Sequence, residues 1–167
     1  APPFGIRPGE TRALLPAAFD AGVYYIGRCR TPWTRREDCP KNAGLSEAPC
    51  ALEIDAAFAP GLKRIEERGW IWAFYWMDRS PRDVVVQKPR HSSDPDSKGV
   101  FALRSPARPN PIAMSALKLE RVERRPDGSA LLHVRGLDCL DGTPLIDVKP
   151  VTTGDARPHH GAMKETA

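Results

Sequence analysis

Residues 104–112 combine residue types that can do chemistry with a backbone that holds them still. They read Arg-Ser-Pro-Ala-Arg-Pro-Asn-Pro-Ile. The prolines fix φ and push the preceding residues into extended backbone, so this segment cannot be a helix and has little freedom to lose on binding. It holds two guanidinium groups, of Arg104 and Arg108, and the carboxamide of Asn110 in a fixed relation. Such a set suits an anionic ligand or the edge of a heterocycle. The alternative is a rigid surface connection with solvated arginines.

Residues 137–150 form a second polar segment, which reads Leu-Asp-Cys-Leu-Asp-Gly-Thr-Pro-Leu-Ile-Asp-Val-Lys-Pro. Its carboxylates are Asp138, Asp141 and Asp147, and Lys149 offsets one of them. Carboxylates that follow a strand can accept hydrogen bonds from ribose hydroxyls or stabilise a cation. Ordinary turn chemistry, in which Asp141 bonds its own backbone, remains an equal alternative.

A weaker signal lies upstream, where four arginines surround an aromatic residue. They are Arg28, Arg30, Arg35 and Arg36, and the aromatic residue is Trp33. A basic patch with an interleaved aromatic can bind nucleic acid by phosphate contact and base stacking. A solvated face is the more common outcome for such a run. A plain nucleic-acid-binding barrel is therefore one hypothesis, and it predicts a steep salt dependence without any need for a cofactor.

The composition limits the classes of protein to consider. A chain of 167 residues with 41% apolar residues suits one globular domain. The net charge is only +4, but eighteen of the 25 basic residues are arginine, which is compatible with a polyanionic partner. The longest apolar run, residues 70–77, is far shorter than the roughly 20 residues of a membrane-spanning helix, so no membrane partner is expected.

The cysteines and the start of the chain indicate the cellular setting. Four cysteines form no Cys-x-x-Cys pair, so we expect neither a zinc knuckle nor a thioredoxin-type site. Residues 1–12 contain no apolar signal-peptide core. We therefore expect a reduced, cytoplasmic protein.

The elements that position these polar side chains are expected to be mostly strands. We expect a proline-rich N-terminal arm over residues 1–22, a β domain over 23–151 and a polar tail over 152–167. Short β-forming runs predict strands at 23–28, 51–55, 70–77, 84–86, 100–103, 112–121, 130–135 and 145–148. Residues 70–77 are aromatic and unbroken, which predicts a strand buried on both faces.

The same reading fixes the fold class. Pro126, Asp127 and Gly128 predict a hairpin turn. Only residues 62–68 look helical, and neither repeated βαβ units nor a Gly-x-Gly-x-x-Gly motif is present, so a Rossmann-type domain is disfavoured. We expect an all-β, mainly β protein: a small β-barrel or strongly curved sheet with one short helix.

Both polar segments resemble one family. Residues 99–112 and 137–150 closely resemble the TsaA-like (YaeB/TrmO) family, and Tyr-Ile-Gly-Arg-Cys-Arg-Thr-Pro at 25–32 resembles its opening strand. Pro-Lys-Asn-Ala-Gly at 40–44 resembles its ligand loop, and residues 70–77 fit its aromatic strand, so the likeness covers roughly residues 23–150.

This resemblance implies a function as well as a fold. Members of the family are homodimeric S-adenosylmethionine-dependent methyltransferases on a small β-barrel, with the cofactor near the interface. The implied reaction methylates the exocyclic nitrogen of threonylcarbamoyladenosine beside the anticodon of tRNA.

The resemblance also implies site residues at matching positions. Residues expected to contact the cofactor are Pro40, Lys41, Asn42, Trp76, Met77, Arg104, Met114 and Leu137. Residues expected at the substrate or in catalysis are Arg108, Asn110, Asp138 and Lys149. Asp138 or Asp141 could act as the base, and we expect neither a covalent intermediate nor a metal.

Three positions depart from the family's pattern. Ala113 stands where the family has glycine, Val151 where it has tyrosine, and Trp76 where relatives carry histidine. These departures favour an alternative: an S-adenosylmethionine-binding module, or a methyltransferase of a small molecule, without tRNA activity.

Overall fold

Ten β-strands dominate the computed structural model, which describes residues 7–41, 43–88 and 96–155. The strands are β1 (Thr11–Arg12), β2 (Gly27–Arg30), β3 (Pro49–Ile54), β4 (Trp70–Trp76), β5 (Val84–Gln87), β6 (Lys98–Gly99), β7 (Ile112–Lys118), β8 (Arg121–Arg124), β9 (Ala130–Arg135) and β10 (Pro144–Pro150). The predicted all-β class is therefore confirmed, and the predicted hairpin turn is present, with Gly128 at φ 87°.

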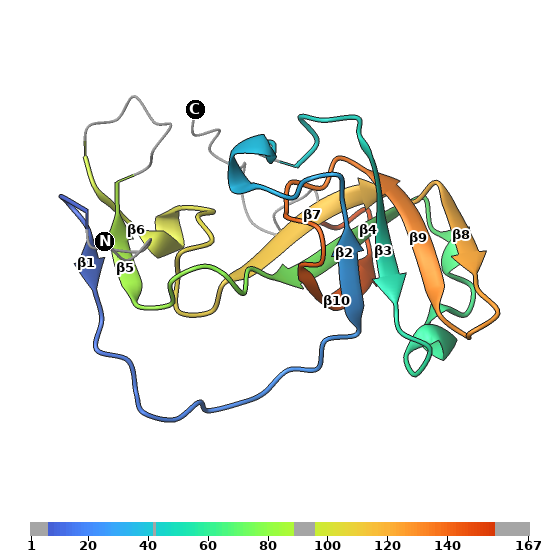
Figure 1. Ribbon diagram of the computed structural model, residues 1–167, viewed down its shortest axis with the longest axis horizontal. Coiled ribbons are helices and arrows are strands. Elements are labelled where there is room, and N and C mark those ends of the chain that lie inside the picture. The colour runs from blue at the N-terminus through green and yellow to red at the C-terminus, as the bar shows by residue number, and fades with distance from the viewer. Residues whose placement is uncertain (1–6, 42, 89–95, 156–167) are drawn as a thin grey trace.

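Two antiparallel sheets share these strands. A seven-stranded sheet has the order β7-β4-β10-β2-β3-β9-β8, and a three-stranded sheet has the order β1-β5-β6. Figure 1 shows the small sheet at one end of the long axis and the large, curled sheet at the other. The chain crosses between them three times, through residues 13–26, 77–83 and 103–111.

The large sheet curls strongly but its ladder is not closed. Its two edge strands, β7 and β8, are consecutive in the chain, with only Leu119 and Glu120 between them. The chain thus bends from the edge that pairs with β4 to the edge that pairs with β9. The expectation of a closed barrel is corrected accordingly: in the described residues the sheet is strongly curved and open, because its first and last strands are linked by chain and not by a hydrogen-bonded ladder.

Alternation of side chains places the core inside the curl. Strand β4 buries Ile71, Ala73 and Tyr75, while the residues between them are partly exposed and Trp70 at its start is 51% exposed. The prediction that this strand is buried on both faces is wrong, because only its inner face lies within the curl. The other large inner residues are Leu52, Ile54, Leu117, Leu132, Val134, Leu137 and Leu145.

The short helices are 3-10 turns. They are η1 (Arg36–Asp38), η2 (Ala59–Leu62), η3 (Ile65–Glu67) and η4 (Val100–Ala102). The helix expected at residues 62–68 is divided between η2 and η3, because Arg64 adopts a left-handed φ of 68° between them. The strand expected at residues 100–103 is wrong: this segment forms η4, whose Val100 packs with Val84 and Ala107 in a second, small core.

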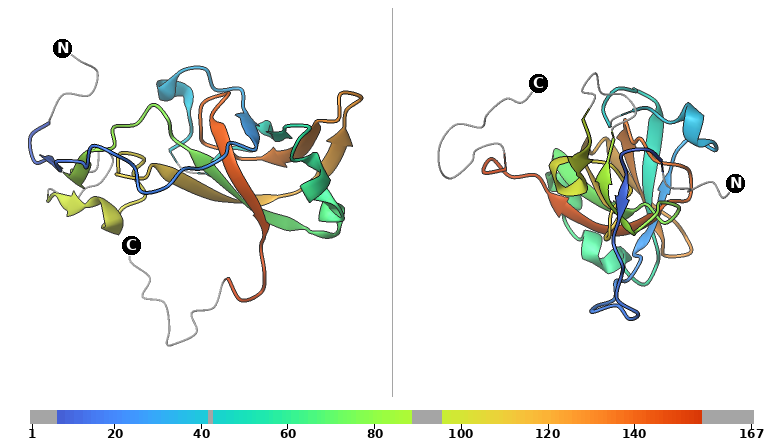
Figure 2. Two further views of the ribbon diagram at one scale, coloured as in Figure 1. Left: turned by 90° about the horizontal axis from the view of Figure 1, so that it is seen from below. Right: turned by 90° about the vertical axis from the view of Figure 1, so that its left-hand side faces the viewer.

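The N-terminal segment is tied to the small sheet. Strand β1 pairs with β5, Ala13 N donates to the carbonyl of Asp83 at 2.7 Å, and Arg12 forms an ion pair with Asp83 at 2.8 Å. Residues 13–26 then run as an extended segment to β2, as Figure 1 and the left view of Figure 2 show. The strand expected at residues 23–28 begins only at Gly27, because residues 23–25 lie exposed in this segment.

Among the residues that the structure describes, none belongs to a helix of the length and apolar character that a membrane span requires.

Gly27 generates a prediction about the large sheet. A Cβ at this position would lie 1.7 Å from the carbonyl oxygen of Glu53 on the paired strand β3. We expect Gly27→Ala to destabilise the protein by roughly 3 kcal/mol, because β2 and β3 must separate to admit the methyl group.

Urea denaturation followed by circular dichroism measures this change. Gly61→Ala is the matched control, since a Cβ there meets no atom within 4 Å, and its effect should stay within about 0.5 kcal/mol. Equal stabilities for the two variants would contradict the prediction.

Candidate active site

A cavity of about 450 Å³ lies where several segments singled out by the sequence meet. The turn around η1 lines one side, and residues 77–80, just after β4, line another. Pro106 of the proline-rich segment and residues 140–143 of the acidic segment complete the wall. This volume lies within the range of about 300–1,000 Å³ that is usual for small-molecule sites.

Charged side chains border this cavity in both signs. Arg35, Arg36 and Arg79 supply positive charge, whereas Glu37, Asp78 and Asp141 supply negative charge. Met77 and Pro106 contribute apolar surface between them. The cavity can therefore accept a ligand that carries a cationic group, an anionic group and an apolar part.

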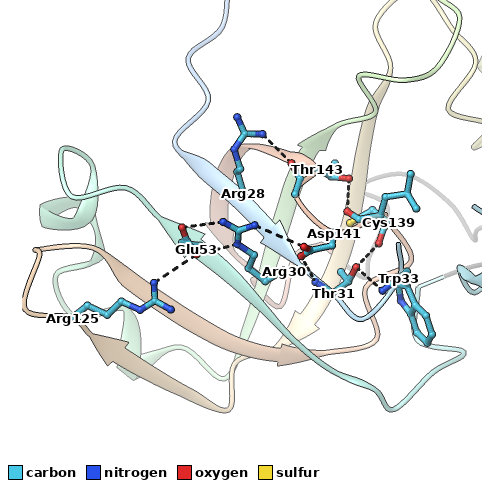
Figure 3. A network of polar contacts seen from close by, with 11 residues as sticks. Arg28, Arg30, Thr31, Trp33, Glu53, Arg125, Cys139, Asp141 and Thr143 are labelled. Carbon is cyan, nitrogen blue, oxygen red and sulfur yellow. Dashed lines mark hydrogen bonds and ion pairs between the residues drawn. The ribbon is translucent and has the colours of Figure 1, made fainter. Parts of the chain in front are cut away.

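A network of hydrogen bonds fixes the acidic turn against the end of β2 (Figure 3). The Asp141 carboxylate accepts from the backbone N–H of Thr31 at 3.1 Å, and Asp141 N donates to the carbonyl of Trp33 at 2.7 Å. Asp141 does not bond its own turn as ordinary turn chemistry would have it. It joins two segments that lie more than a hundred residues apart in the chain.

The arginines of the weak upstream patch are used in this framework. Arg28 donates to the carbonyl of Gly142 at 2.9 Å, and Arg30 pairs with Glu53 at 3.0 Å (Figure 3). The hydrogen bond from Arg30 holds the pKa of Glu53 below its usual value. Arg35 forms an ion pair with Asp38 at 2.9 Å. Arg28, Arg30 and Arg35 therefore each have a partner within the protein, and their contacts serve the framework of the site.

Asp138 is held on both sides of its position in the chain. The Trp33 indole N–H donates to the carbonyl of Leu137 at 3.2 Å, and the Thr31 hydroxyl donates to the carbonyl of Cys139 at 2.8 Å. The Asp138 carboxylate itself accepts from the Tyr75 hydroxyl at 2.7 Å. Asp138 is therefore fixed both through its backbone neighbours and through its side chain.

Tyr75 and Ser115 form a directed chain of hydrogen bonds to Asp138. The Tyr75 and Ser115 hydroxyl oxygens lie 2.9 Å apart. A carboxylate only accepts, so the single Tyr75 proton goes to Asp138, and the Ser115 hydroxyl donates to Tyr75. Burial, followed by the charge of Asp138, raises the pKa of Tyr75 far above its usual value. Tyr75 therefore stays a neutral donor at physiological pH.

The proline-rich segment is braced from within. The Arg108 guanidinium donates to the carbonyl of Ser105 at 2.8 Å and also to the carbonyls of Val100 and Leu103. Met77 N donates to the carbonyl of Pro111 at 2.9 Å, which ties this segment to the end of β4. Arg108 thus holds the loop, while Arg104 is exposed.

The expected ligand loop at 40–44 reaches the acidic segment. Gly44 N donates to the carbonyl of Gly136 at 2.9 Å, and Gly136 has a φ of 83° with no room for a side chain beside Ser46 and Gly44. Cys39, directly before the loop, lines the cavity. Pro40 is half-buried and Lys41 exposed, whereas Asn42 lies outside the described residues.

Of the predicted site residues that the structure describes, Met77 alone lines this cavity. Trp76 and Met114 point to the outer face of the β4–β7 pair, where Met114 is 43% exposed. Lys149 pairs in register with Trp72, five residues before Met77, which places it roughly 17 Å along the strand. Lys149 lines a separate cavity of about 410 Å³ at that end of β4, and its ammonium lies 3.5 Å from Asp147.

Sequence reasoning missed Tyr75, Ser115 and Arg82. Tyr75 and Ser115 are inward positions of paired strands, so strict alternation would have placed them on the inner face. Arg82 contacts the proline-rich segment only through tertiary structure, and the sequence holds no local signal for it. In the described part of the chain, histidine, cysteine and carboxylate side chains do not gather into a group that could hold a metal ion.

Comparison with known proteins identifies relatives over most of the chain. Residues 28–155 match the family described as tRNA-methyltransferase O N-terminal domain. A protein of Rhizobium radiobacter named probable S-adenosyl-L-methionine-binding protein VirR is 43% identical over 145 residues, which is 87% of this chain and 79% of that protein. A tRNA (adenine(37)-N6)-methyltransferase of Eikenella corrodens is 58% identical over 82 residues, 48% of this chain and 45% of that protein.

Solved structures show the same likeness. The crystal structure of TrmO from Pseudomonas aeruginosa matches with a TM-score of 0.62 and 28% identity, over 87% of this chain and 61% of that one. This chain thus spans less than two thirds of the solved TrmO chain and less than half of the Eikenella enzyme. The family match covers most of the chain and includes both polar segments that build the cavity, so the protein belongs to the family of the tRNA-methyltransferase O N-terminal domain.

Proposed function

We propose that this protein is an S-adenosylmethionine-dependent methyltransferase. The reaction that we propose methylates the exocyclic nitrogen of threonylcarbamoyladenosine next to the anticodon of tRNA, and such a substrate would place the protein in the cytoplasm. The observation that carries the proposal is the cavity in which Met77, Pro106 and residues 140–143 meet. The names of the relatives, which include an S-adenosyl-L-methionine-binding protein and a tRNA methyltransferase, support the same conclusion.

The lining of the cavity fits the proposed methyl donor. Asp78 and Asp141 can offset the charge of a sulfonium, Met77 and Pro106 can contact its apolar parts, and the arginines can pair with its carboxylate or with RNA phosphate. When bound, S-adenosylmethionine supplies a methyl group attached to a good leaving group. The protein has to bind, align the acceptor and exclude water.

The residue roles that we propose rest on the positions that match the family. We propose that Pro40, Lys41, Asn42, Met77, Arg104 and Leu137 surround the cofactor, with Trp76 and Met114 contributing from the outer face of the β4–β7 pair. Asp138 is our choice of base, because Tyr75 occupies one of its carboxylate oxygens and the other can take a proton from the acceptor nitrogen. Asn110 contacts ligand, and Arg108 supports the loop. A role for Lys149 at the reacting atoms would require a second protomer, since it lies at the other end of β4 in its own.

We further propose that the protein is a homodimer with the cofactor near the interface. The outer face of the β4–β7 pair supports this arrangement, because it leaves apolar side chains uncovered. Trp70, Ile112 and Met114 are 51%, 45% and 43% exposed. A second copy would remove these side chains from water.

A second candidate function is an S-adenosylmethionine-binding protein or small-molecule methyltransferase without tRNA activity. The specific observation in its favour is that the relative matched over 87% of this chain, at 43% identity, is named a probable S-adenosyl-L-methionine-binding protein. Incubation with labelled cofactor and total tRNA separates the candidates, because label in tRNA excludes the second.

Asp138 generates the first functional prediction. We expect the wild-type protein to bind S-adenosylmethionine in calorimetry and to label tRNA. Asp138→Asn should bind cofactor about as well but methylate at least about 100-fold more slowly, because the amide cannot accept the proton. Single-turnover transfer of labelled methyl measures the rate.

Asp147→Asn is the matched control, since Asp147 lies on the partly exposed side of β10 beside Lys149, and its rate should stay near that of wild type. No heat with the wild-type protein would reject the cofactor. Equal rates for Asp138→Asn and Asp147→Asn would reject Asp138 as the base.

Tyr75→Phe tests the directed hydrogen-bond chain. Removal of the hydroxyl leaves the buried Ser115 hydroxyl without this partner, which should cost roughly 1–3 kcal/mol of unfolding free energy. The rate of methyl transfer should also fall, because Asp138 loses the contact that orients it. Chemical denaturation and single-turnover rates measure the two effects, and an unchanged rate would show that Asp138 is oriented without Tyr75.

Lysine substitutions on the outer face of the β4–β7 pair test the proposed dimer. We expect Ile112→Lys with Met114→Lys to convert a particle of two chains into a monomer, because lysine at both positions would face its own copy across the interface. Analytical ultracentrifugation measures the mass. Arg121→Glu on β8 is the control and should leave the mass unchanged; a wild-type monomer would contradict the dimer.

A further inference from the structure

Arg82 lies against two aromatic rings and next to the proline-rich segment. Its guanidinium carbon is 4.7 Å from the centroid of Phe19 and 5.2 Å from the centroid of Trp76. A planar guanidinium can stack on an aromatic ring with each of its faces. The three residues therefore form one unit, which we call the Phe19–Arg82–Trp76 stack.

The edge of the same guanidinium holds the proline-rich segment. Arg82 Nε donates to the carbonyl of Pro109 at 2.7 Å, and Arg82 Nη2 donates to the side-chain oxygen of Asn110 at 3.3 Å. Stacking uses the faces of the guanidinium and hydrogen bonding uses its edge, so the two kinds of contact reinforce each other.

This pairing determines what Asn110 can offer a ligand. A guanidinium has only donors, so the carboxamide must turn its oxygen toward Arg82. Its amide nitrogen then points away from Arg82 with both N–H donors available, and Asn110 is exposed. Asn110 therefore acts as a donor, and its complement is an acceptor such as a carboxylate or carbonyl oxygen.

Phe19 brings the N-terminal segment into this arrangement. It lies outside residues 28–155, the part of the chain that matches the family. Strand β1 and the Arg12–Asp83 ion pair anchor this segment next to Arg82, and the Phe19 ring lies against the Arg82 guanidinium.

We propose that Arg82 is a positioning residue for the candidate active site, held by Phe19 and Trp76, and that it presents the Asn110 amide as a donor to a carboxylate or carbonyl of the ligand. The proposal rests on the proposed function and adds the N-terminal segment to the site. Asn110 contacts the ligand, and Arg82 acts through Asn110.

Four variants separate the parts of this proposal. Phe19→Ala removes one ring of the stack, and Phe19→Tyr retains it. Arg82→Lys keeps the charge but loses the planar fork. Asn110→Asp still accepts from Arg82 but has no donors for a ligand. Phe101→Ala is the matched control, because Phe101 is 85% exposed and has no ring contact with a guanidinium in the described structure.

The first readout needs no ligand. Fluorine NMR of protein labelled with 5-fluorotryptophan gives a signal for each of the four tryptophans, and Trp76→Phe assigns the signal of Trp76. We expect Phe19→Ala and Arg82→Lys to shift this signal. Phe19→Tyr, Asn110→Asp and Phe101→Ala should leave it near its wild-type position.

The second readout is binding and turnover. Phe19→Ala, Arg82→Lys and Asn110→Asp should each weaken ligand by roughly tenfold, the usual effect of losing one hydrogen bond to a charged group. The weakening appears in the Kd of S-adenosylmethionine if the acceptor belongs to the cofactor, and in the KM for tRNA if it belongs to the RNA. In both cases kcat changes less than KM or Kd, since the base is not altered.

Two results would overturn the proposal. One is an unchanged Trp76 signal in both Phe19→Ala and Arg82→Lys. The other is unchanged Kd and KM in Asn110→Asp while the wild-type protein binds cofactor. A wild-type protein that binds no S-adenosylmethionine would instead contradict the proposed function, so the two failures are distinguishable.

Discussion

Two hydrogen bonds on either side of Asp138 determine the geometry of the candidate active site. They come from Trp33 and Thr31, which follow strand β2, and they end on the carbonyls of Leu137 and Cys139. Because β2 lies in the middle of the large sheet, the acidic turn inherits the rigidity of that sheet. The cavity walls at residues 34–39 and 140–143 are consequently parts of one cross-linked unit, and a carboxylate that must meet a reacting atom does not depend on a free loop.

The proline-rich segment, which contributes Pro106 to the cavity wall, is built differently. Here the proline-rich segment has restricted backbone angles, and Arg108 and Arg82 bind its carbonyl groups from two sides. Arginine suits this task because its fork reaches several carbonyls at once and keeps its charge when partly covered. Arg108, which the sequence placed at the substrate, thus serves the loop, while the exposed Arg104 and Asn110 are left for ligand.

Sequence reasoning succeeded where local preference and burial agree. The strands at 51–55, 70–77, 130–135 and 145–148 and the turn at Gly128 are confirmed within a residue or two, because alternation and turn residues are local signals. It failed at residues 100–103, where packing of Val100 against Val84 selects a 3-10 turn over a strand. It could not find Tyr75 as the partner of Asp138, or Phe19 as a partner of Arg82, since both contacts join distant segments. The meeting of residues 99–112 and 137–150 at one cavity was implied by their resemblance to the family, and the hydrophobic periodicity of the sequence did not predict it.

The short link between β7 and β8 has a consequence for register. The link of Leu119 and Glu120 is too short to absorb a shift, so a one-residue slip of β7 against β4 would move β8 along β9 by the same amount. Such a slip would turn Ser115 and Leu117 outward and, at the same time, break the match of His133 with Arg121. An incorrect register at one end of the sheet therefore forces an incorrect register at the other end. Correct pairing of β7 with β4 thus favours correct pairing of β8 with β9, and the reverse also holds.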